Sequence, residues 1–127
     1  MVGLVLLSHS SKLVEGLSDL VNEMAENIPL YAVGGNAEGG LGSCYELIKE
    51  AINKAYSPEG VVILYDLGST AMTAELVLEE MDENLSSVIK IMRAPLVEGA
   101  VAAAVQIGCG ASLMDVSETL WEMGTVK

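Results

Sequence analysis

Residues 2–11 read VGLVLLSHSS, and the rest of the fold depends on this stretch. Its first six residues form an unbroken apolar run with β-branched members, which is typical of a strand buried on both faces of a parallel sheet. Four polar residues follow, and beyond them the apolar residues take helical spacing. His9 is the only histidine of the chain. It therefore lies where a strand gives way to a helix, the position at which open α/β sheets bind ligands.

The remainder of the chain alternates between apolar runs and helical segments. Three more strands are expected, at residues 30–33, 61–65 and 88–92. Helices are expected from Ser10 or Ser11 to about Asn27, from a cap at Ser43 to about Ala55, and at about 71–81, 97–107 and 112–122. This alternation predicts an α/β fold with an open, mainly parallel four-stranded sheet flanked by helices. A single domain is expected to span residues 1–127.

The order of the strands follows from the connections between them. Right-handed crossovers leave few arrangements, and we prefer the order 2-1-3-4, numbered along the chain. In this order the strands at 2–7 and 61–65 are neighbours, and the direction of winding reverses between them. Their carboxyl ends carry His9 and Asp66. These two side chains are therefore expected to meet in one crevice.

Apolar spacing within the helices predicts which side chains enter the core. In the first helix the expected buried residues are Leu13, Leu17, Leu20, Val21 and Met24. In the second helix they are Leu47, Ile48, Ala51, Ile52 and Ala55. In the last helix they are Leu113, Val116, Leu120 and Trp121.

Composition excludes several classes of function. Eighteen acidic residues against six basic ones give a net charge of −12, which would repel a nucleic acid and would attract a partner with a basic face. The same charge is also explained by solubility alone. No apolar stretch is long enough to span a membrane and no signal peptide is evident, so a cytoplasmic protein is expected. Cys44 and Cys109 lack the spacing of metal ligands, so we expect them to be reduced thiols. We expect no metal or cofactor.

His9 and Asp66 together suggest phosphoryl chemistry. A carboxylate that accepts the Nδ1 hydrogen fixes the tautomer of an imidazole and leaves the lone pair on Nε2. The same pairing stabilises a ring phosphorylated on Nε2, because that ring is cationic and keeps its proton on Nδ1. His9 is the expected phosphoryl acceptor and Asp66 its partner.

Donors for the phosphoryl oxygens are expected nearby. Gly68, Ser69 and Thr70 open a helix, where free N–H groups and the helix dipole favour anions. With Ser10 they form the predicted phosphate-binding group, and Gly35 and Gly39 of the glycine-rich loop 34–43 are possible further contacts. Each signal also has an ordinary structural explanation, such as helix capping. The loop matches neither a dinucleotide-binding motif nor a P-loop, and the chain has no G-x-S-x-G motif.

Four motifs resemble one family over nearly the whole chain. They are LVLLSHSSKLVEGL from Leu4, GGNAEGGLGS from Gly34, DLGSTAMTAE from Asp66 and APLVEGAVAAAV from Ala94. Together they resemble the DhaM family, the phosphotransfer subunits of phosphoenolpyruvate-dependent dihydroxyacetone kinases, whose domain has the mannose-family enzyme IIA fold. Glu38 stands where that family more often has aspartate, a mild departure.

The resemblance implies a phosphohistidine relay. His9 would accept a phosphoryl group from phospho-HPr and pass it to ADP on the DhaL subunit, which works with DhaK to phosphorylate dihydroxyacetone. The resemblance also implies a homodimer and the Asp66 partnership with His9. Two alternatives stay open: the IIA component of a mannose-type sugar transporter, and a regulatory module that senses phosphorylation of His9.

Overall fold

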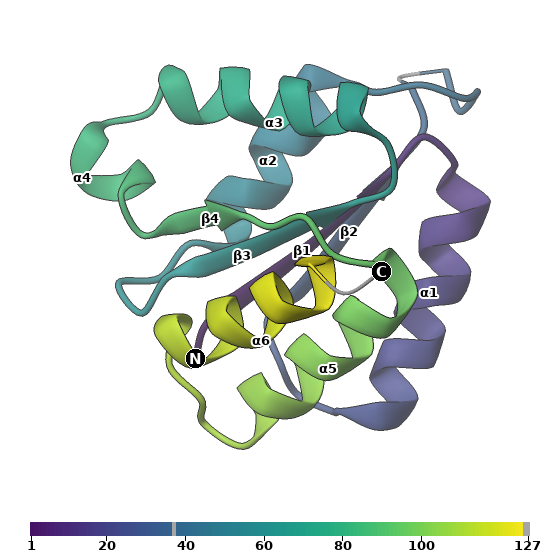
Figure 1. Cartoon of the computed structure of the whole chain (residues 1–127). Helices are drawn as coiled ribbons and strands as arrows, with labels where there is room; N and C mark the ends of the chain where they lie inside the picture. The colour runs from purple at the N-terminus through teal and green to yellow at the C-terminus, as the bar shows by residue number, and fades with distance from the viewer. Residues whose placement is uncertain (37, 126–127) are drawn as a thin grey trace.

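The computed structural model describes residues 1–36 and 38–125 and contains a four-stranded sheet. The strands are β1 (Gly3–Ser8), β2 (Leu30–Gly34), β3 (Val61–Tyr65) and β4 (Ile89–Ile91). All three pairings are parallel, and the order is β2-β1-β3-β4 (Figure 1). The predicted α/β fold and the predicted strand order are both confirmed.

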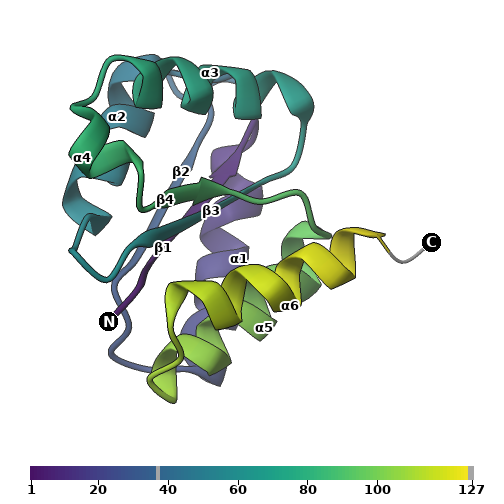
Figure 2. The ribbon, with the colours of Figure 1, turned by 60° about the vertical axis from the view of Figure 1, so that its left-hand side comes forward.

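Helices cover both faces of the sheet. They are α1 (Ser11–Met24), α2 (Tyr45–Ala55), α3 (Gly68–Glu79), α4 (Glu83–Ser86), α5 (Leu96–Gly108) and α6 (Leu113–Thr125). In Figures 1 and 2, α2 and α3 lie on one face, and α1, α5 and α6 lie on the other. The short helix α4 was not predicted. It is a single turn that begins where the Asp82 carboxylate accepts a hydrogen bond from the Asn84 N–H.

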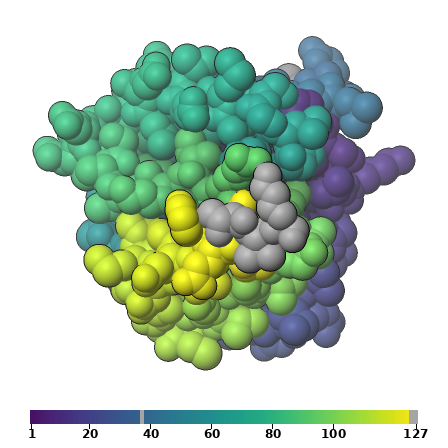
Figure 3. Space-filling model, in the orientation of Figure 1, coloured from purple at the N-terminus to yellow at the C-terminus, as the bar shows by residue number. Residues whose placement is uncertain are grey.

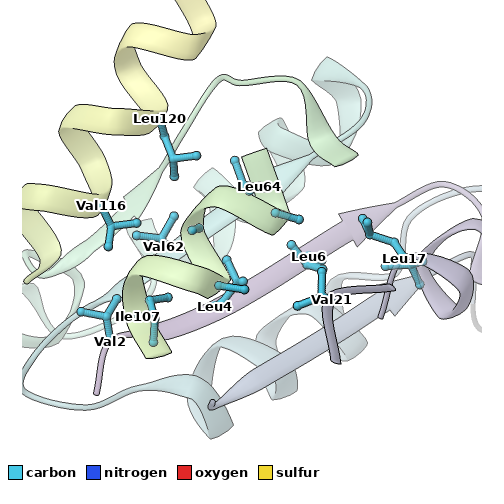
Figure 4. Packing of buried hydrophobic residues seen from close by; sticks show 14 residues of the cluster. Val2, Leu4, Leu6, Leu17, Val21, Val62, Leu64, Ile107, Val116 and Leu120 are labelled. Carbon is cyan, nitrogen blue, oxygen red and sulfur yellow. The ribbon is translucent and has the colours of Figure 1, made fainter. Parts of the chain in front are cut away.

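The two central strands contribute side chains to two separate hydrophobic cores, because successive side chains of a strand point to opposite faces of the sheet. Leu4 and Leu6 of β1 pack with α1, α5 and α6, and Figure 4 shows this cluster at close range. Val5 and Leu7 pack on the other face, with α2 and α3. All four are fully buried. Truncating such a leucine to alanine costs about 2–5 kcal/mol of folding free energy, so β1 is a main source of stability.

The alternation along β1 also determines where His9 points. His9 follows Ser8 by one residue and has the parity of Val5 and Leu7, whose side chains face α2 and α3. Its imidazole therefore turns toward the start of α3. The opposite parity would direct it toward α1 and α5.

The predicted buried faces of three helices were right in part and wrong in part. The residues that are buried as predicted are Leu17, Val21, Ile48, Ala51, Ile52, Ala55, Val116 and Leu120. On α1 the buried residues are Val14, Leu17 and Val21, whereas Leu13, Leu20 and Met24 are 44%, 44% and 54% exposed. Leu47 of α2 is 39% exposed and Trp121 of α6 is 64% exposed. Each helix carries apolar residues on more than one stripe, and the neighbouring sheet or helix contacts only one of them. Figure 3 shows α6, in yellow, lying across the surface.

Gly34 lets the end of β2 approach the start of α1. A Cβ atom at this position would lie 2.4 Å from the Ser10 carbonyl oxygen and 2.8 Å from the Ser11 Cα, so no other residue fits without a backbone shift. This close approach holds the turn after His9 against the neighbouring strand. The glycine is therefore part of the framework that positions the imidazole.

Candidate functional site

The candidate site lies at the carboxyl ends of β1 and β3. Leu7 of β1 is paired with Tyr65 of β3, so the residues that follow the two strands are neighbours. The Asp66 N–H donates to the Leu7 carbonyl oxygen at 3.2 Å and extends this pairing by one bond. His9 and Asp66, which are far apart in the sequence, are brought together here.

The Asp66 carboxylate accepts hydrogen bonds on both oxygens. Oδ2 accepts from the Ser8 hydroxyl at 2.7 Å and from the His9 backbone N–H at 3.1 Å, and Oδ1 accepts from the Leu67 N–H at 2.7 Å. Burial by itself raises the pKa of Asp66, but the hydrogen bonds, that from Ser8 first among them, outweigh it and lower the pKa below its ordinary value. Asp66 is thus an ionised acceptor at neutral pH.

The His9 ring contacts three side chains. Its Nδ1 lies 2.7 Å from Thr70 Oγ1 and 3.5 Å from Asp66 Oδ1. Its Nε2 lies 2.8 Å from Ser69 Oγ. An ionised carboxylate accepts and cannot donate, so Asp66 favours the tautomer with hydrogen on Nδ1 and a lone pair on Nε2. The His9 side chain is 24% exposed, which leaves the ring within reach of a partner.

The first turn of α3 lies beside Nε2. As the first residues of the helix, Gly68 and Ser69 have backbone N–H groups without an intrahelical acceptor, and the positive end of the helix dipole lies here. Both residues are exposed, whereas Thr70 is only 1% exposed and directs its hydroxyl toward Nδ1. Gly68 and Ser69 are therefore placed to hold an anion on Nε2, while Thr70 contacts the opposite nitrogen of the ring.

The remaining predicted residues lie at the edge of the site. The Ser10 hydroxyl accepts from the Leu13 N–H and caps α1. Gly35 is buried and donates to the Ser8 carbonyl oxygen. Gly39 is exposed and donates to the Asn36 carbonyl oxygen. Both glycines have φ of +85°, which suits glycine. No contact between either glycine and the imidazole is present in the described part of the chain.

Two serines that the sequence analysis did not assign to the site belong to this network. Ser8 is 3% exposed and connects to Asp66, and its oxygen also accepts from the Ser10 N–H at 3.0 Å. Ser43 lies 3.2 Å from Thr70 Oγ1, measured between the hydroxyl oxygens. The prediction that Ser43 caps α2 was wrong, because the N-cap is Cys44 and makes no side-chain bond there. A polar residue at the end of a buried strand was the available signal for Ser8.

The described residues show no sign of a metal centre or a membrane segment. Residues 1–36 and 38–125 contain no group of three His, Cys, Asp or Glu side chains able to hold a metal ion. None of the helices in that part of the chain has the length and apolar character needed to cross a bilayer.

Comparison with known proteins places this chain in a family. Residues 3–117 match the EIIA-man family model, described as the PTS system fructose IIA component. The chain belongs to this family. Within it, the chain is similar to a Lactococcus lactis protein named PTS-dependent dihydroxyacetone kinase, phosphotransferase subunit DhaM. The two are 35% identical, over 95% of this chain and 94% of the relative.

Two further similarities support membership of the EIIA-man family. A Listeria innocua protein named PEP-dependent dihydroxyacetone kinase 2, phosphoryl donor subunit DhaM, is 39% identical over 84% of this chain and 86% of its own length. The crystal structure of EF1359, a protein of unknown function, superposes with a TM-score of 0.85 at 29% identity and covers 99% of this chain and 98% of its own. The resemblance to DhaM proteins predicted from the four motifs is confirmed.

Proposed function

We propose that this chain is a phosphohistidine carrier that serves a dihydroxyacetone kinase. In the first step the Nε2 lone pair of His9 attacks the phosphorus of phospho-HPr, and the bond between phosphorus and HPr breaks. In the second step a terminal phosphate oxygen of ADP, bound on a DhaL subunit, attacks the same phosphorus. The bond from phosphorus to Nε2 then breaks, ATP forms, and the ATP phosphorylates dihydroxyacetone held by DhaK.

The arrangement around the imidazole is the observation that carries this proposal. Nε2 faces the free N–H groups and the positive end of α3, while Nδ1 faces the oxygens of Thr70 and Asp66. A phosphorylated ring needs donors on one side and acceptors on the other, because its oxygens are anionic and its Nδ1 keeps a proton. Catalysis is then mainly positioning and charge neutralisation.

The choice of kinase over transporter rests on the relatives. Those at 35% and 39% identity are named as the phosphotransferase and phosphoryl donor subunits of dihydroxyacetone kinases. The net charge of −12 favours partners that present a basic face, which is the property we propose for the docking surface of HPr or of DhaL. No cofactor is required, since the phosphoryl group travels between proteins. We also propose that the chain acts in the cytoplasm and as a homodimer.

Labelling of His9 tests the carrier role. The protein is mixed with phosphoenolpyruvate, enzyme I and HPr, and incorporated phosphate is measured. We expect acid-labile, base-stable phosphate in the parent and none in His9→Gln, because His9 is the only histidine. Lys12→Gln, an exposed change on α1, is the control for folding and handling. Labelling of His9→Gln at the parent rate would refute the proposal.

Onward transfer tests the choice of acceptor. The labelled protein is divided among DhaL–ADP with DhaK and dihydroxyacetone, a sugar-transporter IIB protein, and buffer. Dihydroxyacetone phosphate in the first sample alone is the expected result. Transfer to IIB alone would identify a transporter component, and transfer of the phosphoryl group to neither acceptor would favour the regulatory alternative.

The proposed homodimer is tested by light scattering, which measures the molar mass of the same protein. A monomer at working concentration would contradict the homodimer.

A further inference from the structure

Ser43 reaches the imidazole through Thr70. Its hydroxyl oxygen lies 3.2 Å from Thr70 Oγ1, which lies 2.7 Å from Nδ1 of His9. Ser43 comes from the end of the glycine-rich loop, before α2, while Thr70 comes from the first turn of α3. Two elements on the same face of the sheet are thus joined to His9 by a chain of two hydroxyl groups.

The direction of the hydrogen bonds along this chain has a chemical consequence. A threonine hydroxyl has one hydrogen and two lone pairs, so it can donate to Nδ1 or accept from it. If Thr70 donates to Nδ1, the ring hydrogen moves to Nε2 and the lone pair needed for attack on phosphorus is lost. If Thr70 accepts from Nδ1–H, its own hydrogen needs another acceptor. Ser43 Oγ is the one acceptor recorded for that hydrogen among the described residues.

We infer that Ser43 is a positioning residue that holds His9 in the tautomer competent for phosphoryl acceptance. Ser43 accepts the Thr70 hydroxyl hydrogen, Thr70 Oγ1 accepts the His9 Nδ1 hydrogen, and Nε2 keeps its lone pair. Asp66 Oδ1, 3.5 Å from Nδ1, supports the same tautomer, and the Ser69 hydroxyl donates to Nε2. This role rests on the proposed carrier function of His9, although the tautomer itself can be measured without any phosphoryl transfer.

The single histidine makes the tautomer directly visible. The ¹⁵N chemical shifts of the ring are recorded for the unphosphorylated protein, above the pH at which the ring is protonated. We expect the parent to show hydrogen on Nδ1 and Ser43→Ala to show a larger fraction with hydrogen on Nε2. Transfer from phospho-HPr to Ser43→Ala should be about five-fold slower, the effect of one neutral hydrogen bond. Ser43→Thr keeps a hydroxyl and should restore both properties.

A second variant separates this role from a merely structural one. Thr70→Val keeps the shape of the buried side chain but removes the hydroxyl through which Ser43 acts. In the Thr70→Val background the further change Ser43→Ala should alter neither the tautomer nor the transfer rate. Ser87→Ala removes an exposed hydroxyl that bonds to the Asn84 carbonyl, and it serves as the control.

Each outcome of these measurements has one meaning. An unchanged tautomer in Ser43→Ala, or an equal effect of that change with and without the Thr70 hydroxyl, would overturn the role of Ser43. If Ser43→Ala does not fold, the tautomer of Thr70→Val is measured in its place. Because Ser43 acts through the Thr70 hydroxyl, a tautomer unchanged from that of the parent would then overturn the role of Ser43. A parent protein that takes up no phosphate would refute the carrier function, whereas the ¹⁵N shifts would still report whether Ser43 sets the tautomer.

Discussion

The rim formed by the carboxyl ends of β1 and β3 is polar, whereas the hollow between β4 and α6 is apolar. Ser8 and Thr70, which are 3% and 1% exposed, both lie at the rim. The hollow has a volume of about 600 Å³, and most of its wall surface is apolar. Its lining residues are Met92, Leu113, Met114 and Trp121 together with the polar residues Lys90, Ser117, Glu118 and Glu122. Its size would suit a small molecule.

This contrast shows where the chain concentrates its costly interactions. A buried hydroxyl needs a partner, because leaving it unpaired costs about 1–3 kcal/mol. Ser8 and Thr70 both have partners in the network around His9 and Asp66. A carrier that receives a phosphoryl group from one protein and gives it to another requires such a rim, with the reacting nitrogen accessible. A deep apolar cavity is not needed for that chemistry.

The largest effect on phosphate uptake is expected from Asp66→Asn, a change at the rim. This change removes the negative charge that favours hydrogen on Nδ1, and charge-assisted hydrogen bonds of this kind account for about a 100-fold change in rate. The rate of phosphate uptake from phospho-HPr measures the effect. Asp19→Asn, at an exposed position on α1, is the matched control. Equal rates for the two variants would show that the carboxylate has no role at the rim.

A smaller effect is expected from Ser69→Ala. The Ser69 hydroxyl lies beside Nε2, where it can donate to a phosphoryl oxygen, and its loss should slow transfer about ten-fold. The backbone N–H of residue 69 is kept in this variant, so some stabilisation of the anion remains. Stopped-flow measurement of transfer to and from HPr checks the effect. Ser112→Ala, which removes the hydroxyl bonded to the Asp115 N–H, provides the control.

Acid stability offers a third comparison between the rim and the rest of the molecule. The pKa of Asp66 is lowered in the folded protein, so its stabilising contribution is complete above the ordinary value of 3.8 and is lost as pH falls through the lower folded value. The free energy of unfolding should therefore fall less steeply below about pH 4 in Asp66→Asn than in the parent. Urea titrations across this range measure it, and parallel curves would contradict the hydrogen-bonded carboxylate.

The smallest effect is expected in the hollow. Trp121→Ala removes an exposed side chain on α6, on the face of the sheet opposite to α3. Phosphate uptake should change by less than about two-fold, since surface substitutions away from a site rarely exceed ±0.5 kcal/mol. The same uptake assay applies, with Met114→Ala as a second probe of the hollow. A loss comparable to that of Ser69→Ala would break the contrast and connect the hollow to phosphoryl transfer.

Much of the fold could be predicted because its signals are local. The unbroken apolar runs at 2–7 and 61–65 identify buried parallel strands, and the right-handed connection rule then limits their order. Helical faces were harder to predict. Leu13, Val14 and Leu17 of α1 are all apolar, and only contact with β2 and α5 selects the last two for burial. Trp121 of α6 was likewise predicted to be buried because it is apolar, and it is exposed.

The sequence by itself predicted which groups would meet at the candidate site: one histidine after the first strand, one aspartate after the third, and a small polar turn that opens a helix. Residue types and strand order are enough for that, because parallel strands bring their carboxyl ends to one edge of the sheet. Asp66 was predicted as the partner of Nδ1, but only the tertiary structure placed Thr70 beside that nitrogen and Ser69 beside Nε2. It also added Ser8 and Ser43 to the network. Hydrogen bonds depend on tenths of an ångström between segments about 60 residues apart, and no local pattern in a sequence carries that information.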